Sequence, residues 1–598
     1  MDASATSSTP ATPVGPAASK SLRAGWPDRL WLLLCITASS LWCVTAARHV
    51  GPTFDEPNYV VNGLERWRIG SYGQLMRQGT MPLPVDVISW PLHVWEQARG
   101  TPFRVGLDEN RHPVILDDLP LLLPVARLGT LPFWWLLLFY AWKIGWTAGP
   151  WGGRLAVTLT ACEPNLLAHA TLATTDVAAA ACLLMLTFHF ATHRESDWRR
   201  RVMIPGVLFG VALLAKASAL VFWPLCWLGI EAHRLWLARR ADRPRGFGVS
   251  AVELRAAFRD GRQIALIGLL VAFLYVGTEF RPERSFVAWS HSLPDGALGR
   301  CMTFAADHLR IFPNAGEGLV YQIKHNIRGH GVYVLGQTHH RALWYYFPLA
   351  LAIKLSLASL LLLPAVAALH RRALRHWVVA AIAALLLFSI GYRVQIGIRL
   401  VLPIVALIVI GGGIAVSLAL SNAESVARRR LCAGVALVAV AWGSFTSLNA
   451  WPHALAYTNE VFDRDWRGGP ALCDSNIDWG QGLIELDEWR QKRDLPNLDV
   501  WYFGTDPAAK APPFRLLPLH VIGAADVDGV GEQVQGDLLA VSTTLLYGPS
   551  LSPEHEQSAG ILRKLRPVDR TTTFFIFDVA SAASEMSVAE RESTSAVR

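Results

Sequence analysis

The sequence predicts an α-helical polytopic membrane protein with a small α/β domain at its C-terminal end. Of its 598 residues, 52% are hydrophobic and only 17% are charged, which is not the composition of a mostly water-soluble chain. Apolar stretches near the roughly 20 residues needed to cross a bilayer recur from about residue 30 to about residue 450, and we count about eleven of them. Beyond residue 450 the apolar runs become shorter and strand-like.

Three parts follow one another along the chain. Residues 1–28 form a cytoplasmic tail, whose Ser/Thr/Ala/Pro-rich start predicts disorder because it cannot build a core. Residues 29–450 form the transmembrane region, with two long loops at about 48–118 and 281–341, and loops of this length are usually functional. Residues 451–598 form the α/β domain, with predicted strands in LDVWYFG, PLHVIGA, GDLLAVSTTLLYG and TTTFFIFDVA and an amphipathic helix in GLIELDEWRQKRD.

The positive charge predicts membrane topology. A net charge of +8 would suggest nucleic acid as the partner of a soluble protein, but here the arginines gather in loops between apolar spans, so we expect no nucleic acid. Their clusters predict a cytoplasmic N-terminus, with both long loops and residues 451–598 outside a cell membrane, either inner or plasma. The clusters are Arg194 with Arg199–Arg201, then Arg234 to Arg262, then Arg371, Arg372 and Arg375, and finally Arg428–Arg430.

The first apolar span, WLLLCITASSLWCVTAA, could be a signal peptide or a retained helix. Its long apolar core and the many spans that follow favour the retained helix.

Cysteine and metal-ligand patterns say little. Only Cys301 and Cys473 fall in predicted outer segments, and either a disulfide between them or two free thiols agrees with the sequence. No CxxC, HExxH, Walker or GxGxxG spacing occurs. A divalent metal is therefore compatible with the chain but not indicated by it.

Acidic residues mark one face of the membrane. TFDEPNYVVNG places Asp55 and Glu56 just after the first span, where they either cap a helix that begins near Pro57 or take part in chemistry. Asp176 falls in the turn between the third and fourth spans, on the same face, and its plainer explanation is a solvated turn or an N-cap. The helix after Pro57 should lie on the membrane surface through one apolar face: Tyr59, Val60, Gly63, Leu64 and Trp67.

Several segments in order resemble a known family. They are FDEPNYVVNG, RLAVTLTACEPNLLAHATLATTDVAAA, LLAKASAL, GVYVLGQTHHRALWYYFPLALAIK, IGIRLVLP, PHALAYTNEVF and DSNIDWGQGL. The chain resembles the protein O-mannosyltransferase-like membrane glycosyltransferases of glycosyltransferase family 39, in the GT-C superfamily, which include the aminoarabinose lipid A transferases. It departs from that pattern at Gly482, where we expect an acid.

The resemblance implies a GT-C fold and transfer of a sugar from a polyprenyl-phosphate carrier to an acceptor on the outer face. Such a reaction needs a base for the acceptor hydroxyl proton. Asp55 matches the family's first-loop acid and is our candidate for the base. Glu56 would orient the acceptor, Asp55 or a cation, because Pro57 pushes its backbone into an extended form. Asp176 would shape the same pocket.

The leaving phosphate of such a donor calls for fixed cations near the membrane surface. Lys216, Lys354, Arg393 and Arg399 interrupt or flank apolar spans, where charges are costly and are functional candidates by default. The alternative is that their side chains extend to the lipid headgroups.

Other residues are candidate substrate contacts. Tyr345 and Tyr346 would add hydroxyl groups, although anchoring at the membrane interface explains them equally well. The motif DSNIDWGQG either builds a turn or contacts a glycan, because carboxylates and aromatic faces bind sugars. Its candidates are Asp474, Asn476, Asp478 and Trp479.

Three classes of function fit the sequence. A glycosyltransferase, of hexosyl, mannosyl or aminoarabinosyl type, accounts for the acids, the long loops and the order of the motifs. A multi-pass transporter or flippase of envelope lipids or glycans accounts for charges in the spans, but it should show internal symmetry, which we do not find. A surface receptor accounts for the outer domain. The expected partners of the enzyme are membrane lipids, the lipid-linked donor, and a protein, lipid or glycan acceptor.

Overall fold

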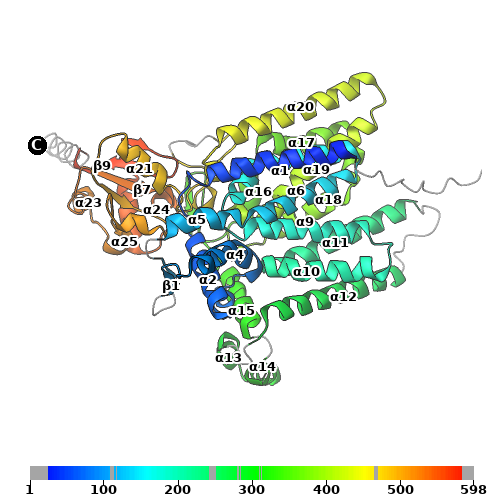
Figure 1. The fold of residues 1–598 in the computed structure, drawn as a ribbon, viewed down its shortest axis with the longest axis horizontal. Coiled ribbons are helices and arrows are strands. Elements are labelled where there is room, and N and C mark those ends of the chain that lie inside the picture. The colour runs from blue at the N-terminus through cyan, green and yellow to red at the C-terminus, as the bar shows by residue number, and fades with distance from the viewer. Residues whose placement is uncertain are drawn as a thin grey trace, which may run out of the picture.

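A long helical region is followed by a smaller domain that contains a sheet (Figure 1). The computed structural model describes residues 25–107, 113–115, 118–241, 251–278, 282, 284–308, 310, 313–462 and 469–581. Most of the predicted tail, 1–28, lies outside these residues. The predicted fold class, a helical region of membrane type with a small C-terminal α/β domain, is confirmed.

Four helical segments are long and apolar enough to cross a membrane, judged within the described residues by length and composition. They are α1 (Trp26–Ala46), α5 with α6 (Leu119–Leu128 and Leu131–Trp146), η3 with α19 (Ile398–Val401 and Leu402–Ser421) and α20 (Val426–Asn449). A fifth span results if α16 (Tyr346–Lys354) and α17 (Leu357–Leu369), bent by 112° to each other, are taken together.

The other apolar stretches also form helices, but these are shorter or carry more charge. They are α7 (Pro150–Ala161), α8 (Pro164–Ala170), α9 (Asp176–Thr192), η1 (Arg199–Met203), α10 (Ile204–Ala215), α11 (Ala219–Ala241), α12 (Ala251–Val276) and α18 (Trp377–Ser389), with the turn η2 (Arg371–Arg375) before α18. The count of about eleven spans therefore stays a prediction.

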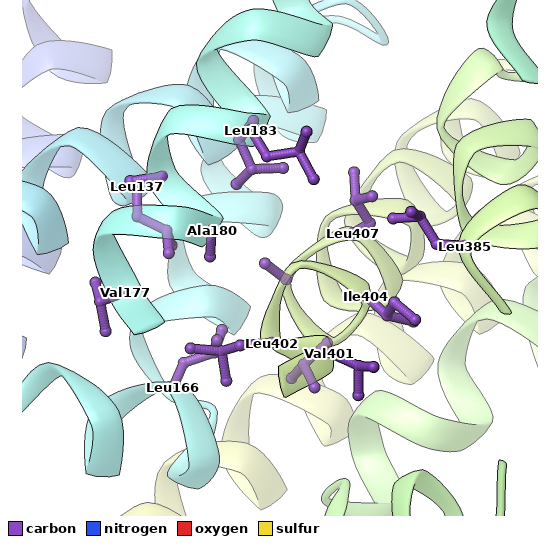
Figure 2. Packing of buried hydrophobic residues seen from close by; sticks show 14 of the residues in the cluster. Leu137, Leu166, Val177, Ala180, Leu183, Leu385, Val401, Leu402, Ile404 and Leu407 are labelled. Atoms are coloured by element: carbon purple, nitrogen blue, oxygen red, sulfur yellow. The ribbon is translucent and has the colours of Figure 1, made fainter. Parts of the chain in front are cut away.

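The centre of the helical region is packed around α19. Figure 2 shows Val177, Ala180 and Leu183 of α9 facing Leu402 and Leu407 of α19 across this core. Glycines allow close helix contacts here, as in membrane helix pairs: a Cβ on Gly413 would lie 2.7 Å from the backbone nitrogen of Ala156. This packing fixes the position of α9 relative to α19. The candidate site lies where both helices begin, at Asp176 of α9 and at the turn η3 that leads into α19.

The first long loop folds against the bundle as α2 (Glu56–Ile69), α3 (Gly73–Arg77), α4 (Pro82–Arg99), β1 (Val105–Leu107) and β2 (Pro113–Ile115). The apolar face of α2 was expected to lie on the membrane. Instead, Val60 and Leu64 are fully buried in a cluster that includes Ile88 and Leu92 of α4. The sequence could not reveal this, because a periodic apolar face suits a protein neighbour as well as a bilayer.

The second loop forms α13 (Arg284–His291), α14 (Ala297–His308), α15 (Pro313–Arg328), β3 (Val332–Val334) and β4 (Gln337–His339). Its end lies beside the residues that precede Arg399, because the backbone N–H of His330 donates to the carbonyl of Arg393 at 3.2 Å.

The C-terminal domain has a five-stranded sheet in the order β6-β5-β7-β9-β8. Strand β5 is parallel to its neighbours β6 and β7. Strand β9 is antiparallel to its neighbours β7 and β8. Its strands are β5 (Leu498–Trp501), β6 (Phe514–Leu516), β7 (Leu538–Ser542), β8 (Asp569–Arg570) and β9 (Phe574–Asp578). Its helices are α21 (Leu483–Gln491), α22 (Leu519–Ile522), α23 (Val527–Gly531), α24 (Thr543–Tyr547) and α25 (Pro553–Leu562). Its 3₁₀ turns are η5 (Asp474–Asn476) and η6 (Pro507–Lys510), and a further turn, η4 (Ala454–Ala456), precedes η5.

Most of the predicted elements of this domain are confirmed. LDVWYFG, the first half of GDLLAVSTTLLYG and TTTFFIFDVA contain β5, β7 and β9, and GLIELDEWRQKRD contains α21. The strand predicted in PLHVIGA is wrong, because this segment forms α22. A short apolar run does not distinguish a strand from a helical turn, and Gly523, at φ +71°, ends this one.

The two ends of the helical region differ. Figure 1 shows the C-terminal domain at the end where α1 and α20 finish, while both helices start at the opposite end. The start of α20 carries the cluster Arg428–Arg430, and Arg29 lies at the start of α1. Arg29, the cluster Arg428–Arg430 and the C-terminal domain thus lie as the predicted topology requires, with these arginines at the end opposite the domain.

A fusion experiment tests this topology. We expect a C-terminal alkaline phosphatase fusion to be active and a C-terminal fusion to a cytoplasmic reporter to be inactive, because residues 451–598 should be outside. A fusion after residue 241, behind α11, should give the reverse pattern and is the internal control. An inactive phosphatase at the C-terminus would contradict the orientation and, with it, an outward-facing site.

Candidate active site

An ion pair between the first loop and the start of α19 forms the centre of the site. Asp55 directly precedes α2, and its Oδ2 accepts a hydrogen bond from Nη1 of Arg399 at 2.7 Å. Arg399 lies in the 3₁₀ turn η3 that leads into α19. The Asp55 side chain makes no capping hydrogen bond to α2, so helix capping does not explain this acid.

Asp176 and Lys216 form a second ion pair beside the first. Asp176 is the first residue of α9 and is buried, and its Oδ1 accepts a hydrogen bond from the Lys216 ammonium group at the end of α10. Its Oδ2 lies 4.0 Å from Nη1 of Arg399. The structure therefore brings together four of the predicted residues, Asp55, Asp176, Lys216 and Arg399, from separate parts of the chain.

Two buried polar atoms at this centre have no hydrogen-bond partner within the described residues: Oδ2 of Asp176 and Nε of Arg399. Buried polar groups in folded proteins are almost always hydrogen-bonded. This unsatisfied acceptor and this unsatisfied donor are therefore groups that a polar substrate can satisfy.

The motif DSNIDWGQG supplies the far wall of the site. The guanidinium carbon of Arg399 lies 3.9 Å from the ring centroid of Trp479, in a cation–π contact. The Trp479 carbonyl also accepts a hydrogen bond from the backbone N–H of Phe54 at 2.8 Å, next to Asp55. Trp479 thus holds the arginine and the first loop together, which fits the structural alternative that the sequence left open beside a sugar contact.

Asp474 lies close enough to Arg399 and Asp55 to interact electrostatically with both. Burial raises the pKa of its carboxyl to about 6; the Ser475 N–H and Arg399 oppose the rise, and Asp55 adds to it. Its backbone has φ +59°, a left-handed conformation that few residues other than glycine adopt.

The remaining residues of the motif have structural partners. Asn476 is buried, its Nδ2 donates to the Tyr346 hydroxyl at 2.9 Å, and its Oδ1 accepts from the backbone N–H of Ile398 at 3.1 Å. Asp478 is buried and accepts hydrogen bonds from the backbone N–H groups of Gly480 and Thr544. The prediction of substrate contact is therefore corrected for Asn476, Asp478 and Tyr346, whose polar groups bind the protein itself.

Lys354 is not placed to bind a phosphate. It is buried, and its ammonium group donates to the carbonyl oxygens of Leu455 at 2.8 Å and Asn476 at 2.6 Å. Its charge thus holds the start of the C-terminal region against α16. Lys354 and Lys216 each interrupt an apolar stretch, so the sequence could not distinguish their roles.

Two predicted residues lie at the edge of the site. Arg393 is exposed in the segment before η3, and within the described residues its side chain forms no ion pair. Tyr345 is half-buried and packs edge-on against Trp344, with 5.5 Å between the ring centroids. Their predicted roles in binding stay predictions.

Glu56 points away from Asp55 into a buried cluster. Its carboxylate accepts two hydrogen bonds from Arg127, at 2.9 and 2.8 Å, and others from Thr53 and from the backbone N–H of Ala173 at 2.7 Å. Burial alone would raise its pKa, but Arg127 and these hydrogen bonds hold the pKa below its usual value. With both oxygens occupied, Glu56 does not orient an acceptor; it fixes the loop that carries Asp55.

Sequence reasoning missed two residues near Asp55. Arg127 lies in the apolar run LPLLLPVARLGT, and a lone arginine there is the kind of charge that should have been examined. Tyr59 follows Asp55 by one helical turn and is buried; burial raises its pKa, and the nearby Asp55 contributes to the rise.

The structure also explains the glycine where an acid was expected. A Cβ on Gly482 would lie 1.7 Å from Oγ1 of Thr573, so no larger side chain fits without a shift. The two outer cysteines are free thiols: Cys301 is exposed on α14, and Cys473 is buried with its Sγ 3.4 Å from the Thr543 carbonyl. The disulfide alternative is therefore wrong. Within the described residues no three His, Cys, Asp or Glu side chains are grouped so as to hold a metal ion.

Comparisons with known proteins give only distant likenesses, all of them to solved structures. No family model matches the chain, and no curated protein matches it. Among solved structures, ArnT from Cupriavidus metallidurans bound to undecaprenyl phosphate is 14% identical, with a TM-score of 0.41, and the match covers 91% of this chain and 97% of that chain. The apo state of the same protein matches with 14% identity and a TM-score of 0.41, over 92% and 98% of the chains. A likeness this weak carries no argument about the site.

The Glu56–Arg127 pair gives a stability prediction. Glu56→Gln should lower the free energy of unfolding by about 3–5 kcal/mol, because it leaves a buried arginine without its counter-charge. Thermal unfolding in detergent measures this. The control is Glu65→Gln on the same helix, since Glu65 pairs with Arg68 at 3.0 Å in a partly exposed position, where such a pair contributes about 0–1 kcal/mol. Equal stability of the two variants would contradict the structural role of Glu56.

Proposed function

We propose that this chain is a membrane glycosyltransferase of the GT-C type, which transfers a sugar from a polyprenyl-phosphate-linked donor to an acceptor on the outer face of the membrane. The observation that carries the proposal is the cluster of Asp55, Asp176, Lys216 and Arg399, with two acids and two cations at the end of the helical region that holds the C-terminal domain. The order of the family-like motifs supports it.

Asp55 is the proposed general base. Its side chain is 25% exposed, so an acceptor can reach it, whereas Asp176 is buried. In the reaction, the acceptor hydroxyl gives its proton to the Asp55 carboxylate while its oxygen forms a bond to the anomeric carbon of the sugar. The bond from that carbon to the donor phosphate breaks, and the phosphate oxygen keeps the electron pair.

Arg399 and Lys216 are the proposed ligands of the donor phosphate. The charge of the phosphate increases as the bond breaks, and fixed cations in a water-poor site stabilise that change. The Nε–H of Arg399 has no partner within the described residues and can donate to a phosphate oxygen. Lys216 is 23% exposed and can contact the phosphate while it stays paired with Asp176. Arg393 is a proposed outer contact for the same group.

The type of sugar and the class of acceptor follow only from the family resemblance. Hexosyl, mannosyl and aminoarabinosyl donors, and protein, lipid or glycan acceptors, all suit a site of this charge. A transporter or flippase is less well supported, because the charged cluster lies where the helices meet the C-terminal domain and not at mid-membrane between two symmetric halves.

The base assignment predicts a large loss of activity in Asp55→Asn. Asparagine keeps the shape of the side chain and can still accept a hydrogen bond from Arg399, but it cannot take a proton. Transfer from a polyprenyl-phosphate sugar should fall by about 10² or more, with little change in thermal stability. Single-turnover rates of purified protein measure this.

The matched control is Asp118→Asn. Asp118 also directly precedes a helix of the first-loop region, and its Oδ2 accepts a hydrogen bond from the backbone N–H of Arg104 at 2.8 Å. This variant should transfer sugar at the wild-type rate. An Asp55→Asn enzyme that also transfers at that rate would end the assignment of Asp55 as the base.

The assignment of Arg399 and Lys216 as phosphate ligands predicts that substitutions of either residue weaken binding of the donor. Arg399→Lys and Lys216→Met should each weaken binding of a polyprenyl monophosphate by about 10- to 100-fold, because a hydrogen bond to a charged group contributes about 1.5–3 kcal/mol. Arg399→Lys keeps the charge but loses the planar fork, so it should also lose affinity. Titration of the lipid against detergent-solubilised protein measures both effects.

Arg428→Met is the control for the loss of a charge. Arg428 is exposed at the start of α20, at the opposite end of the helical region. Its removal should leave binding unchanged. Wild-type affinity in both Arg399→Lys and Lys216→Met would show that the donor phosphate binds elsewhere.

A further inference from the structure

A small groove lies between α1, α5 and the end of α8. Its volume is about 110 Å³, and most of its wall is apolar, including Val44 of α1 and Pro124 and Leu128 of α5. Pro124 and Leu128 are exposed, so the groove is open on the side of α5. Within the part of the chain that the structure describes, no residue of the charged cluster at Arg399 lines it. The groove is therefore separate from the candidate active site.

The groove lies at the level of a membrane surface. Helix α1 is long and apolar enough to span a bilayer, and only 17% of its apolar stretch is buried inside the protein, so most of its side chains would face lipid. Val44 lies in the last turn of this helix, and Arg48, which also lines the groove, lies just beyond its end. The apolar wall is thus at the depth of acyl chains, and Arg48 is at the depth of lipid headgroups.

The groove offers one uncompensated positive charge. Arg48 and Arg127 line it, and no acidic residue among the described residues does. All five N–H groups of Arg127 are used, because two donate to Glu56 and three donate to backbone carbonyl groups at the end of α1. Arg48 is exposed, and its side chain forms no ion pair or hydrogen bond with another described residue. A negatively charged ligand would therefore bind to Arg48.

We propose that this groove binds one anionic phospholipid, from the leaflet on the side where α1 meets the C-terminal domain (Figure 1). The lipid phosphate accepts hydrogen bonds from the guanidinium of Arg48, since arginine binds phosphate through paired N–H groups. Part of one acyl chain packs against Val44 and Leu128, where its burial adds to the affinity. A lipid without net charge binds less tightly, because the groove has a positive charge and no acid beside it. This site does not depend on the proposed glycosyl transfer.

A lipid in this groove would also support the loop that carries Asp55. Arg127 lines the groove and pairs with Glu56 at 2.8 Å, and Glu56 directly follows Asp55 in the chain. A ligand that binds only the folded protein raises its unfolding temperature. The anionic lipid should therefore stabilise the chain.

Titration of the detergent-solubilised full chain with lipid, followed by native mass spectrometry, tests the site. The wild type should bind one phosphatidylglycerol more tightly than phosphatidylcholine. Arg48→Met should weaken binding of phosphatidylglycerol by about fivefold or more, which is the effect of one basic residue at an anionic membrane surface. Binding of phosphatidylcholine should stay nearly unchanged. Arg29→Met is the matched control, since Arg29 is exposed near the start of the same helix and should be dispensable for this binding.

A second variant fills the groove. Val44→Trp should weaken binding of both lipids, because the larger side chain occupies the space of the acyl chain. Leu34→Trp is its control, since Leu34 is 56% exposed on α1 and does not line the groove. Phosphatidylglycerol should raise the unfolding temperature of the wild type, Arg29→Met and Leu34→Trp, but have little effect on Arg48→Met and Val44→Trp. A role of Arg48 in the fold alone would not remove this response to lipid.

Three results would overturn the inference. The first is a wild type that binds phosphatidylglycerol and phosphatidylcholine equally well. The second is wild-type affinity for phosphatidylglycerol in either Arg48→Met or Val44→Trp. The third is displacement of the bound phosphatidylglycerol by a polyprenyl monophosphate, because the groove would then belong to the donor site. A chain that binds phosphatidylglycerol as expected but transfers no sugar would contradict the proposed function and leave this lipid site in place.

Discussion

The guanidinium of Arg399 is the constraint on which the site depends. A buried cation is costly unless opposite charges and hydrogen bonds compensate for it. Here Asp55 contacts it at 2.7 Å, the Trp479 ring lies 3.9 Å away, and Asp176 lies 4.0 Å away. These partners come from the first loop, the C-terminal domain and the start of α9. The three parts must therefore dock together before the arginine is compensated, and the site exists only in the fully folded chain.

Two neighbouring acids show how burial assigns different roles. Glu56 is fully buried and saturated by Arg127, Thr53 and Ala173, while Asp55 remains partly exposed beside Arg399. Arg127 also donates to the carbonyl oxygens of Ala47, Val50 and Gly51, so it ties the end of α1 to the beginning of the first loop. The position of Asp55 thus follows from the buried pair next to it. The sequence DEP contains both acids but does not tell which one faces the substrate.

The sequence could reveal where charges interrupt apolar segments but not what each charge meets. Lys216 and Lys354 have similar surroundings in the sequence, yet one pairs with Asp176 and the other with two backbone carbonyl groups. That difference depends on packing between segments far apart in the chain. The helical region and most strands were predictable because hydrophobic period and length determine them. The apolar face of α2 and the segment PLHVIGA were not, because their patterns suit two environments equally well.

The C-terminal domain belongs to the site and is not an independent module attached to a membrane anchor. The backbone N–H of Gly51 donates to the carbonyl of Gln481 at 2.9 Å, and that of Phe54 donates to the carbonyl of Trp479 at 2.8 Å, so the segment just before Asp55 is hydrogen-bonded to the motif DSNIDWGQG. The same motif contacts Ile396 and Ile398, just before Arg399, through Ser475 and Asn476. A receptor domain would need none of these contacts. Asp55, Arg399 and Trp479 therefore share one rigid support, and a shift of the C-terminal domain would change the geometry of all three together.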